Sequence, residues 1–202
     1  MDSSTPDGPY NLQELWLRFE NWLCQNAPAD HATLRPGVSD AEIVRLEEEI
    51  GFALVDELKS FLAIHNGVAS RRSSMEPGAF IIGYSLLNAE GIMEWQHNLA
   101  DMAQEAFDEG YENDVVELTA NSRWVPFAQS LAGDLLFVDH RTDRYGHVGV
   151  ISFGSPEYRR LWPSMGQMFY DLCNAVEALE QLPTMPRRPC IHEGRMLEWV
   201  ID

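Results

Sequence analysis

Residues 34–67 read LRPGVSDAEIVRLEEEIGFALVDELKSFLAIHNG and predict two successive amphipathic helices. The first helix starts after Ser39, because Ser39 and Glu42 are spaced as in a capping box, which satisfies the free amides at a helix start. Gly51 suits the left-handed backbone position that ends such a helix. The second helix repeats its apolar side chains at the same spacing and is predicted to stop at Asn66-Gly67.

A third amphipathic helix is predicted before this stretch, after a short polar lead at residues 1–11 that we expect to be flexible. Its apolar side chains run from Leu12 to Leu23 along one face and include Trp16 and Trp22. Packing of both tryptophans into the core is favoured over their exposure as a partner surface.

The second half of the chain reads mainly as a sheet. Trp124–Ala128 is predicted to be extended, with Pro126 favouring the edge or the end of a sheet strand. Leu135–Asp139 is apolar on both faces, which is typical of a central strand. A polar connection joins it to Val148–Ile151 as a hairpin-like pair. Before this sheet, Ala79–Leu87 reads as a buried strand.

Two further helices and a C-terminal extension complete the predicted order. Apolar side chains recur at helical spacing in residues 92–106 and again in residues 165–179. Residues 183–202 form the extension, whose proline-rich start at 183–189 should lack regular structure. Its end, 196–201, alternates like a strand and is expected to add an edge to the protein's own sheet or to pair with another chain.

Length and composition indicate one domain with terminal extensions. A chain of 202 residues with 45% hydrophobic content is typical of a single globular domain with its own core. We find no apolar run of the ~20 residues that a membrane helix needs, and no secretory signal at the start, so we expect a cytoplasmic protein without a membrane role. The three cysteines have no metal-binding spacing and predict no disulfide framework.

The formal charge of −18 restricts the class of partner. A field of that sign repels nucleic-acid backbones and attracts cationic proteins. Residues 105–117 carry acidic side chains with almost no basic ones to compensate them. They predict either a solvated acidic loop or a docking surface. The candidate partner-binding carboxylates are Glu105, Asp108, Glu109, Glu112, Asp114 and Glu117, with Asp134 and Asp139 at the rim of the sheet.

Catalysis and cofactor binding are not favoured by the residue pattern. The best candidate for a catalytic site is the cluster of Asp134, Asp139, His140, Asp143 and His147. These residues could act as a hydrolase site only with a bound metal. In an extended strand, Asp134 and Asp139 fall on opposite faces, so no metal site is predicted. Gly133-Asp134 is interpreted as a turn, and Glu47 as a side chain that ties down the following loop.

The ordered set of these segments resembles the Smi/Knr cell-wall-assembly-regulator family of the SUKH superfamily, over roughly Leu12 to Leu182. The first part of the match is the capped helix with Glu47 and the later Asn66-Gly67. The second part is the strand with Trp124 and Pro126, followed by Gly133-Asp134 and a strand ending in Asp139. Family-motif positions, mostly structural, are Trp16, Glu47, Asn66, Gly67, Trp124, Pro126, Gly133 and Asp134.

This resemblance implies an α+β fold in which helices pack on a curved, mainly antiparallel sheet, and a function exerted by binding. Bacterial relatives include immunity proteins that block secreted toxins, and fungal relatives support cell-wall synthesis and signalling. The first hypothesis is an immunity-type protein that neutralises a basic toxin domain. The alternative is an intracellular scaffold in cell-wall or stress signalling. One departure is Leu54-Val55, where the family usually has Leu-Pro before the helix.

Overall fold

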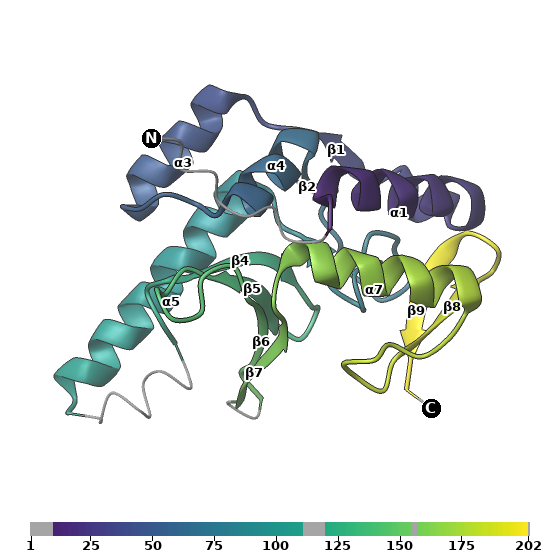
Figure 1. The fold of residues 1–202 in the computed structure, drawn as a ribbon. Coiled ribbons are helices and arrows are strands. Elements are labelled where there is room, and N and C mark those ends of the chain that lie inside the picture. The colour runs from purple at the N-terminus through teal and green to yellow at the C-terminus, as the bar shows by residue number, and fades with distance from the viewer. Residues whose placement is uncertain (1–9, 111–119, 155–156, 202) are drawn as a thin grey trace.

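The computed structural model describes residues 10–110, 120–154 and 157–201 (Figure 1). Within them the helices are α1 Leu12–Asn26, α2 Pro28–His31, α3 Asp40–Ile50, α4 Asp56–Ile64, α5 Ala89–Asp108 and α7 Met165–Ala178. The strands are β1 Leu34–Pro36, β2 His65–Val68, β3 Ser85–Leu86, β4 Trp124–Gln129, β5 Leu135–Asp139, β6 Val148–Ser152, β7 Glu157–Trp162, β8 Arg188–His192 and β9 Met196–Val200.

The main sheet is five-stranded and antiparallel, in the order β3-β4-β5-β6-β7. Two separate hairpins accompany it, β1-β2 and β8-β9. The predicted α+β class with a mainly antiparallel sheet is therefore confirmed. β5 is the central strand, as its apolar character on both faces predicts, and all five of its residues are buried.

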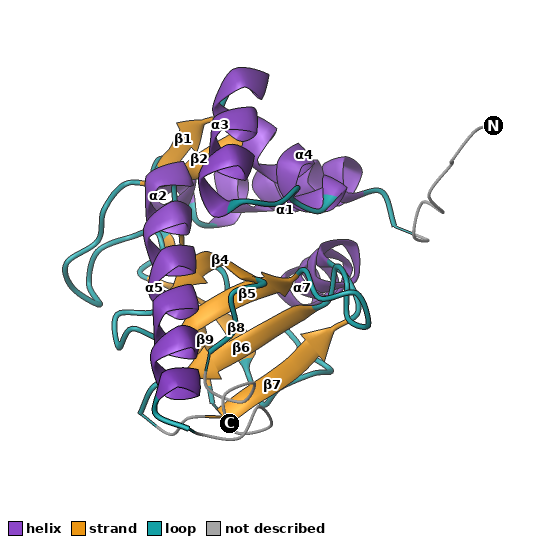
Figure 2. Ribbon diagram, turned by 90° about the vertical axis from the view of Figure 1, so that its left-hand side faces the viewer, coloured by secondary structure: helices purple, strands orange, loops and turns teal. Residues whose placement is uncertain are grey.

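Each face of the main sheet packs against a different set of helices (Figure 2). Along β5, Leu136 and Val138 contribute to the large core shared with α1, α3, α4 and α7. Leu135 and Phe137 point to the opposite face, where they pack with Leu99 of α5. Alternation along one strand thus supplies both cores, because successive side chains point to opposite faces.

The N-terminal helices form as the sequence predicts. Asn11 caps α1 by accepting hydrogen bonds from the amides of residues 13 and 14, and Trp16 is buried in the core. Ser39 and Glu42 form the reciprocal capping box of α3, and Gly51 ends that helix with φ +81°. The predicted flexible lead at residues 1–11 lies almost wholly outside the described residues.

The prediction of a strand over 79–87 is wrong for most of its length. Only the end of this run pairs with β4, through Ser85–Leu86 and the amide of Leu87, while Ile82 and Gly83 adopt positive φ angles of 57° and 88° and turn the chain back on itself. Tyr84 then donates its amide to the carbonyl of Ile81. The apolar run is buried as expected, but burial alone does not distinguish a strand from a tight turn.

Three other boundaries differ from the sequence predictions. α4 ends at Ile64, so Asn66-Gly67 lies inside β2 rather than at a helix end. β4 is an interior strand, and Pro126 falls at an irregularity of its pairing with β5, where its missing amide removes no regular ladder bond. β7 was not predicted from sequence, although it forms one edge of the main sheet.

The C-terminal extension is more regular than its prolines suggest, since β8 begins at Arg188 and includes Pro189. β9 forms, but it pairs with β8 instead of adding an edge to the main sheet. Leu197 and Trp199 are buried in the large core. The extension therefore completes that core.

A buried carboxylate fastens this extension to the N-terminal half. Asp30 of α2 accepts hydrogen bonds from the amides of Gly78 and Leu197, each at 2.6 Å, and is 1% exposed. Burial raises the pKa of Asp30, an effect that the two amide hydrogen bonds oppose. One side chain thereby joins three segments that are far apart in sequence.

Candidate protein-binding surfaces

The family-motif residues at the start of the domain hold loops and helix ends in place. Glu47 accepts the amide of Leu54 at 2.9 Å, as the interpretation of this residue as a tie for the following loop predicts. Asn66 accepts the amide of Ala89 at 2.8 Å and so caps the start of α5. Gly67 has φ +71°, and a Cβ atom there would lie 2.6 Å from the backbone of Leu87. Only glycine therefore allows this close approach.

Replacing Glu47 by alanine should lower the free energy of unfolding by about 1–2 kcal/mol, because the partly buried amide of Leu54 loses its acceptor. Urea denaturation followed by tryptophan fluorescence measures this loss. The matched control is Glu48→Ala on the exposed side of the same helix, which should stay within about 0.5 kcal/mol of the parent. If both substitutions lowered the free energy of unfolding equally, Glu47 would not have the assigned role of holding the following loop.

The second group of motif residues builds an aromatic stack on the α5 side of the sheet. Trp124 stacks on Phe137 with ring centroids 4.4 Å apart and on Tyr158 at 5.1 Å. Gly149 makes room for the stack, since a Cβ atom would lie 2.6 Å from the Phe137 ring. The Arg141 guanidinium lies 5.5 Å from the Trp124 ring and also binds Asp139. This arrangement is consistent with a structural role.

The residues of the candidate catalytic cluster take part in separate structural contacts. Asp139 is 1% exposed and is held by Arg141 through hydrogen bonds of 2.7–3.1 Å, so the expectation that it lies at an accessible rim is wrong. In the turn before β5, the Ser130 hydroxyl accepts the amide of Asp134 at 3.1 Å, and Gly133 has φ +94°. Within residues 10–110, 120–154 and 157–201, no three His, Cys, Asp or Glu side chains converge as a metal site.

Both ring nitrogens of His140 form hydrogen bonds with backbone groups. Its Nε2 accepts the amide of Val55 at 3.0 Å, so the ring proton resides on Nδ1 and is donated to the carbonyl of Val138 at 3.0 Å. Burial lowers the pKa of His140 to about 4. The imidazole is therefore neutral near pH 7 and connects the start of α4 to the end of β5.

The exposed face of α5 carries a stripe of carboxylates, interrupted by His97, which we call the acidic ridge. Its members are spaced by four, seven, four and three residues, which places them on one side of a helix. α5 contains no Lys or Arg, and Figure 1 shows its C-terminal half extending past the strands. The ridge consists of Glu90, Glu94, Asp101, Glu105 and Asp108, with Glu109 at the helix end, and all six are exposed.

This ridge destabilises the helix that carries it. Like charges four residues apart, such as Asp101 and Glu105, cost ~0.2–0.5 kcal/mol per pair. Asp108 and Glu109 also stand at the negative end of the helix dipole, where cations are preferred. Two apolar side chains flank the stripe, Met102 at 38% and Phe107 at 60% exposure. Acidic and apolar side chains are therefore exposed together on α5.

The contact surface predicted from the sequence spans residues 105–117, and the described part of that segment belongs to the ridge. Glu105, Asp108 and Glu109 are exposed at the end of α5. Glu112, Asp114 and Glu117 lie outside the described residues. The ridge also extends towards the N-terminus as far as Glu90, which the helical spacing of its acids would have predicted.

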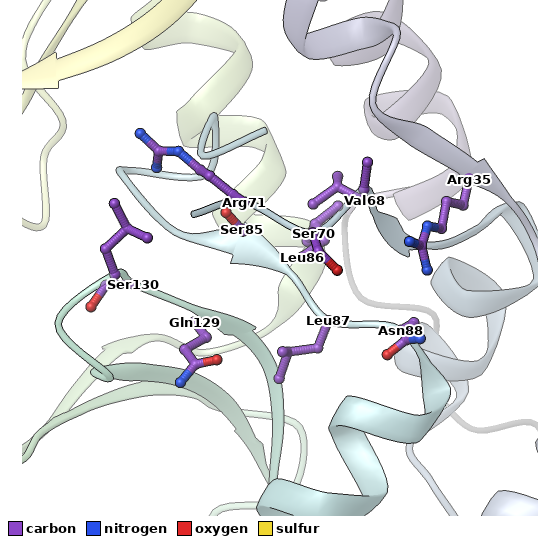
Figure 3. Close-up of a pocket in the computed structure, with 12 residues that line it drawn as sticks. Arg35, Val68, Ser70, Arg71, Ser85, Leu86, Leu87, Asn88, Gln129 and Ser130 are labelled. Atoms are coloured by element: carbon purple, nitrogen blue, oxygen red, sulfur yellow. The ribbon is translucent and has the colours of Figure 1, made fainter. Parts of the chain in front are cut away.

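A groove of about 250 Å³ opens between the edges of β2 and β3 (Figure 3). Val68, Leu86 and Leu87 contribute apolar side chains to it, and Arg35 and Arg71 lie on opposite sides. No pattern in the sequence indicates this site, because its lining comes from four separate segments. The polar lining is completed by Ser70, Ser85, Asn88, Gln129 and Ser130.

Comparison with known proteins gives one family and two curated relatives. The model of the SMI1 / KNR4 family (SUKH-1) matches residues 37–171, about two thirds of the chain. The chain is 31% identical over 85 residues to "KNR4/SMI1 homolog 2" of Debaryomyces hansenii, covering 42% of this chain and 14% of that protein. It is 24% identical over 175 residues to "Cell wall biosynthesis/cell cycle regulator smi1" of Schizosaccharomyces pombe, covering 76% of this chain and 34% of that protein.

The chain thus spans about a third or less of the length of these relatives. Both matches are to fungal proteins, and the second name refers to regulation of the cell wall and the cell cycle. In the part of the chain that the structure describes, none of the helices combines the length and the apolar character needed to cross a lipid bilayer.

Proposed function

Because this chain belongs to the SMI1/KNR4 family (SUKH-1), we propose that it is a non-catalytic module that binds a cationic protein through the acidic ridge of α5. The observation that carries the proposal is the one-sided stripe of carboxylates, in which like charges four residues apart are unfavourable in a helix. Sites that reduce local stability are typical of surfaces kept for binding.

Binding would proceed in two physical steps. The net charge of −18 and the ridge attract a basic partner over long range, and steered association of this kind reaches ~10⁸ M⁻¹s⁻¹ at low salt. Met102 and Phe107 then bury apolar surface against the partner, and such contacts lengthen the lifetime of the complex. Electrostatics thus governs the rate of encounter, and the apolar contacts govern dissociation.

Two biological settings fit such a module. Regulation of cell-wall synthesis is supported by the name of the Schizosaccharomyces pombe relative, and the partner would then be a basic region of that machinery. Immunity-type neutralisation of a cationic toxin is favoured by the ridge itself, because a carboxylate stripe can cover a basic nucleic-acid-binding surface. Both settings place the protein inside the cell and assign it the same docking surface.

Reversing two charges of the ridge should abolish salt-sensitive partner binding. The variant carries Glu105→Lys and Asp108→Lys, and both side chains are exposed. Tagged protein is used for affinity capture from a lysate of the source organism at about 50 mM salt and again at about 500 mM, where surface charges are largely screened. We expect the parent to retain a basic partner at low salt only, and the variant to lose at least ~10-fold of this binding.

The control variant carries Glu14→Lys and Glu180→Lys, which change the net charge equally at exposed positions outside the ridge. It should retain the partner. Equal losses in both variants would show that only net charge matters and would overturn the ridge as a docking site. The identity of the captured protein, toxin-like or associated with the cell wall, decides between the two settings.

A further inference from the structure

We propose that the free edge of β7 binds an extended, acidic segment of another protein as an added strand. β7 spans Glu157–Trp162 at one edge of the main sheet and pairs, among the described strands, with β6 alone. Figure 2 shows the strands of this sheet in succession, with β7 outermost. The ligand has the opposite charge to that of a partner for the acidic ridge, so the inference goes beyond the function proposed above.

The peptide groups of alternate residues of β7 face this open edge. Where β5 ends, Asp139 donates its amide to the carbonyl of His147 at 2.8 Å, and alternation along β6 then directs the peptide groups of Val150 towards β7. Val150 is paired with Arg159, so the peptide groups of Arg159 face β6. Those of its two neighbours in sequence consequently face outward, where an added strand would bond them, as in β-augmentation.

Two exposed arginines follow one another on this edge strand and point to opposite faces of the sheet. Arg159 lies across from Val150, on the side of the large core. Arg160 lies across from Gly149, on the side of the aromatic stack. Neither guanidinium forms an ion pair within the described residues. Both charges are therefore available to a ligand that pairs with β7.

The part of the sequence that contains β7 is much less acidic than the rest of the chain. Residues 120–162 carry five arginines against four acidic residues, although the whole chain has a net charge of −18. At ~150 mM salt the field of a charge decays over ~8 Å, so a ligand bound against β7 responds mainly to the arginines beside it. Figure 1 shows the C-terminal end of α5, where the acidic ridge ends, apart from β7.

The charge on this edge determines which occupant it accepts. Two copies of the chain joined through β7 would bring the arginines of both close together, and like charges on paired strands are unfavourable. An acidic segment instead places carboxylates across from Arg159 and Arg160. Because these arginines are adjacent, the ligand needs two adjacent acidic residues. The residue beside them lies across from Tyr158, which is half-buried and stacks on Trp124, so a β-branched or aromatic side chain fits there.

The test selects ligands for the immobilised chain from phage-displayed random twelve-residue peptides. We expect the selected sequences to share two adjacent acidic residues beside a β-branched or aromatic one. In fluorescence anisotropy at ~150 mM salt, a synthetic copy should bind Arg159→Gln/Arg160→Gln at least ~10-fold more weakly than the parent. The matched control is Arg45→Gln/Arg72→Gln, which removes two exposed arginines elsewhere and should bind normally. The charge-reversal variant of the ridge should also bind normally, which separates this site from the proposed function.

Strand pairing is tested by hydrogen exchange of the backbone amides, followed by NMR. In the free chain the amides of Tyr158 and Arg160 should exchange at least ~10-fold faster than that of Arg159, which faces β6. Saturation with the selected peptide should slow both by at least ~10-fold and leave the exchange of Arg159 unchanged, because an added strand accepts only the outward amides.

Several results would overturn the proposal. They are the selection of no acidic peptide, equal binding to the two arginine variants, and unchanged exchange of Tyr158 and Arg160 in the complex. Dimerisation of the free chain, detected by analytical ultracentrifugation and lost in Arg159→Gln/Arg160→Gln, would also overturn it, because the edge of β7 would then bind a second copy. Thermal unfolding of both arginine variants verifies that they are folded.

Discussion

Replacing Asp30 by alanine should lower the free energy of unfolding by about 3–5 kcal/mol, because two buried amides lose their acceptor at once. The amides of Gly78 and Leu197 come from a loop and from β9, and both donate to the carboxylate of Asp30. An effect of this size would remove a large part of the ~5–15 kcal/mol that stabilises an ordinary domain.

Two variants sharpen this prediction. Asp30→Asn offers one carbonyl oxygen and an amide group, so it can satisfy only one of the two donors and should fall between alanine and the parent. Asp143→Ala removes an exposed carboxylate and should change stability by no more than about 0.5 kcal/mol. Chemical denaturation measures all three. A loss below about 1 kcal/mol for Asp30→Ala would contradict the role of Asp30 as a buried anchor.

The second large effect is a loss of stability in acid that depends on His140. Burial lowers the pKa of His140 to about 4, whereas the unfolded chain binds this proton near pH 6.5. The contribution of His140 is complete above pH 6.5 and declines as the pH falls from 6.5 to about 4. A fall of the pKa from 6.5 to about 4 corresponds to about 3 kcal/mol.

His140→Gln isolates this contribution, because glutamine can accept the amide of Val55 and donate to Val138 without titrating. Denaturation curves for parent and variant at several pH values should diverge between pH 6.5 and 4. Asp139 and Arg123 also act on the imidazole, with opposite signs, and both remain in the variant. Parallel curves over this range would show that His140 does not hold the depressed pKa.

The family departure at Val55 explains why His140 can act in this way. Val55 precedes α4 with φ −62°, an angle that proline also adopts, so Val55→Pro fits the backbone. Proline has no amide to donate, and His140 would lose its partner on Nε2. Val55→Pro, which restores the usual Leu-Pro of the family, therefore removes the hydrogen bond that connects the start of α4 to the end of β5.

Local patterns predicted those parts of the fold that local physics determines. The capping box at Ser39, the αL glycine at Gly51 and the central strand β5 all follow from neighbours in sequence, and each is confirmed. The buried run at 79–82 was misassigned because Ile82 adopts a positive φ, which a β-branched residue rarely does. β7 was missed because its exposed arginines obscure the alternation of Tyr158 and Trp162.

The candidate surfaces were also predicted only in part, because a sequence pattern indicates only what neighbouring residues determine. Glu105, Asp108 and Glu109 are neighbours along one helix, so composition and spacing were sufficient to single them out. Asp139 carries a similar charge, yet it is 1% exposed and is bound by Arg141, whose guanidinium lies over the ring of Trp124 in the neighbouring strand β4. The groove between β2 and β3 is lined by four segments that are far apart in sequence, so no local pattern predicts it.

The hydrogen bonds of Asp30 also determine when this core can be completed during synthesis of the chain. Its second donor, Leu197, is synthesised 167 residues after it. At the usual pace of ribosomes, ~5–20 residues per second, that interval is roughly 10–30 s. During this time the carboxylate faces water, and the N-terminal helices lack the hairpin that covers them. Local helices form in microseconds, so the slowest step in completing this core is the arrival of its last strand.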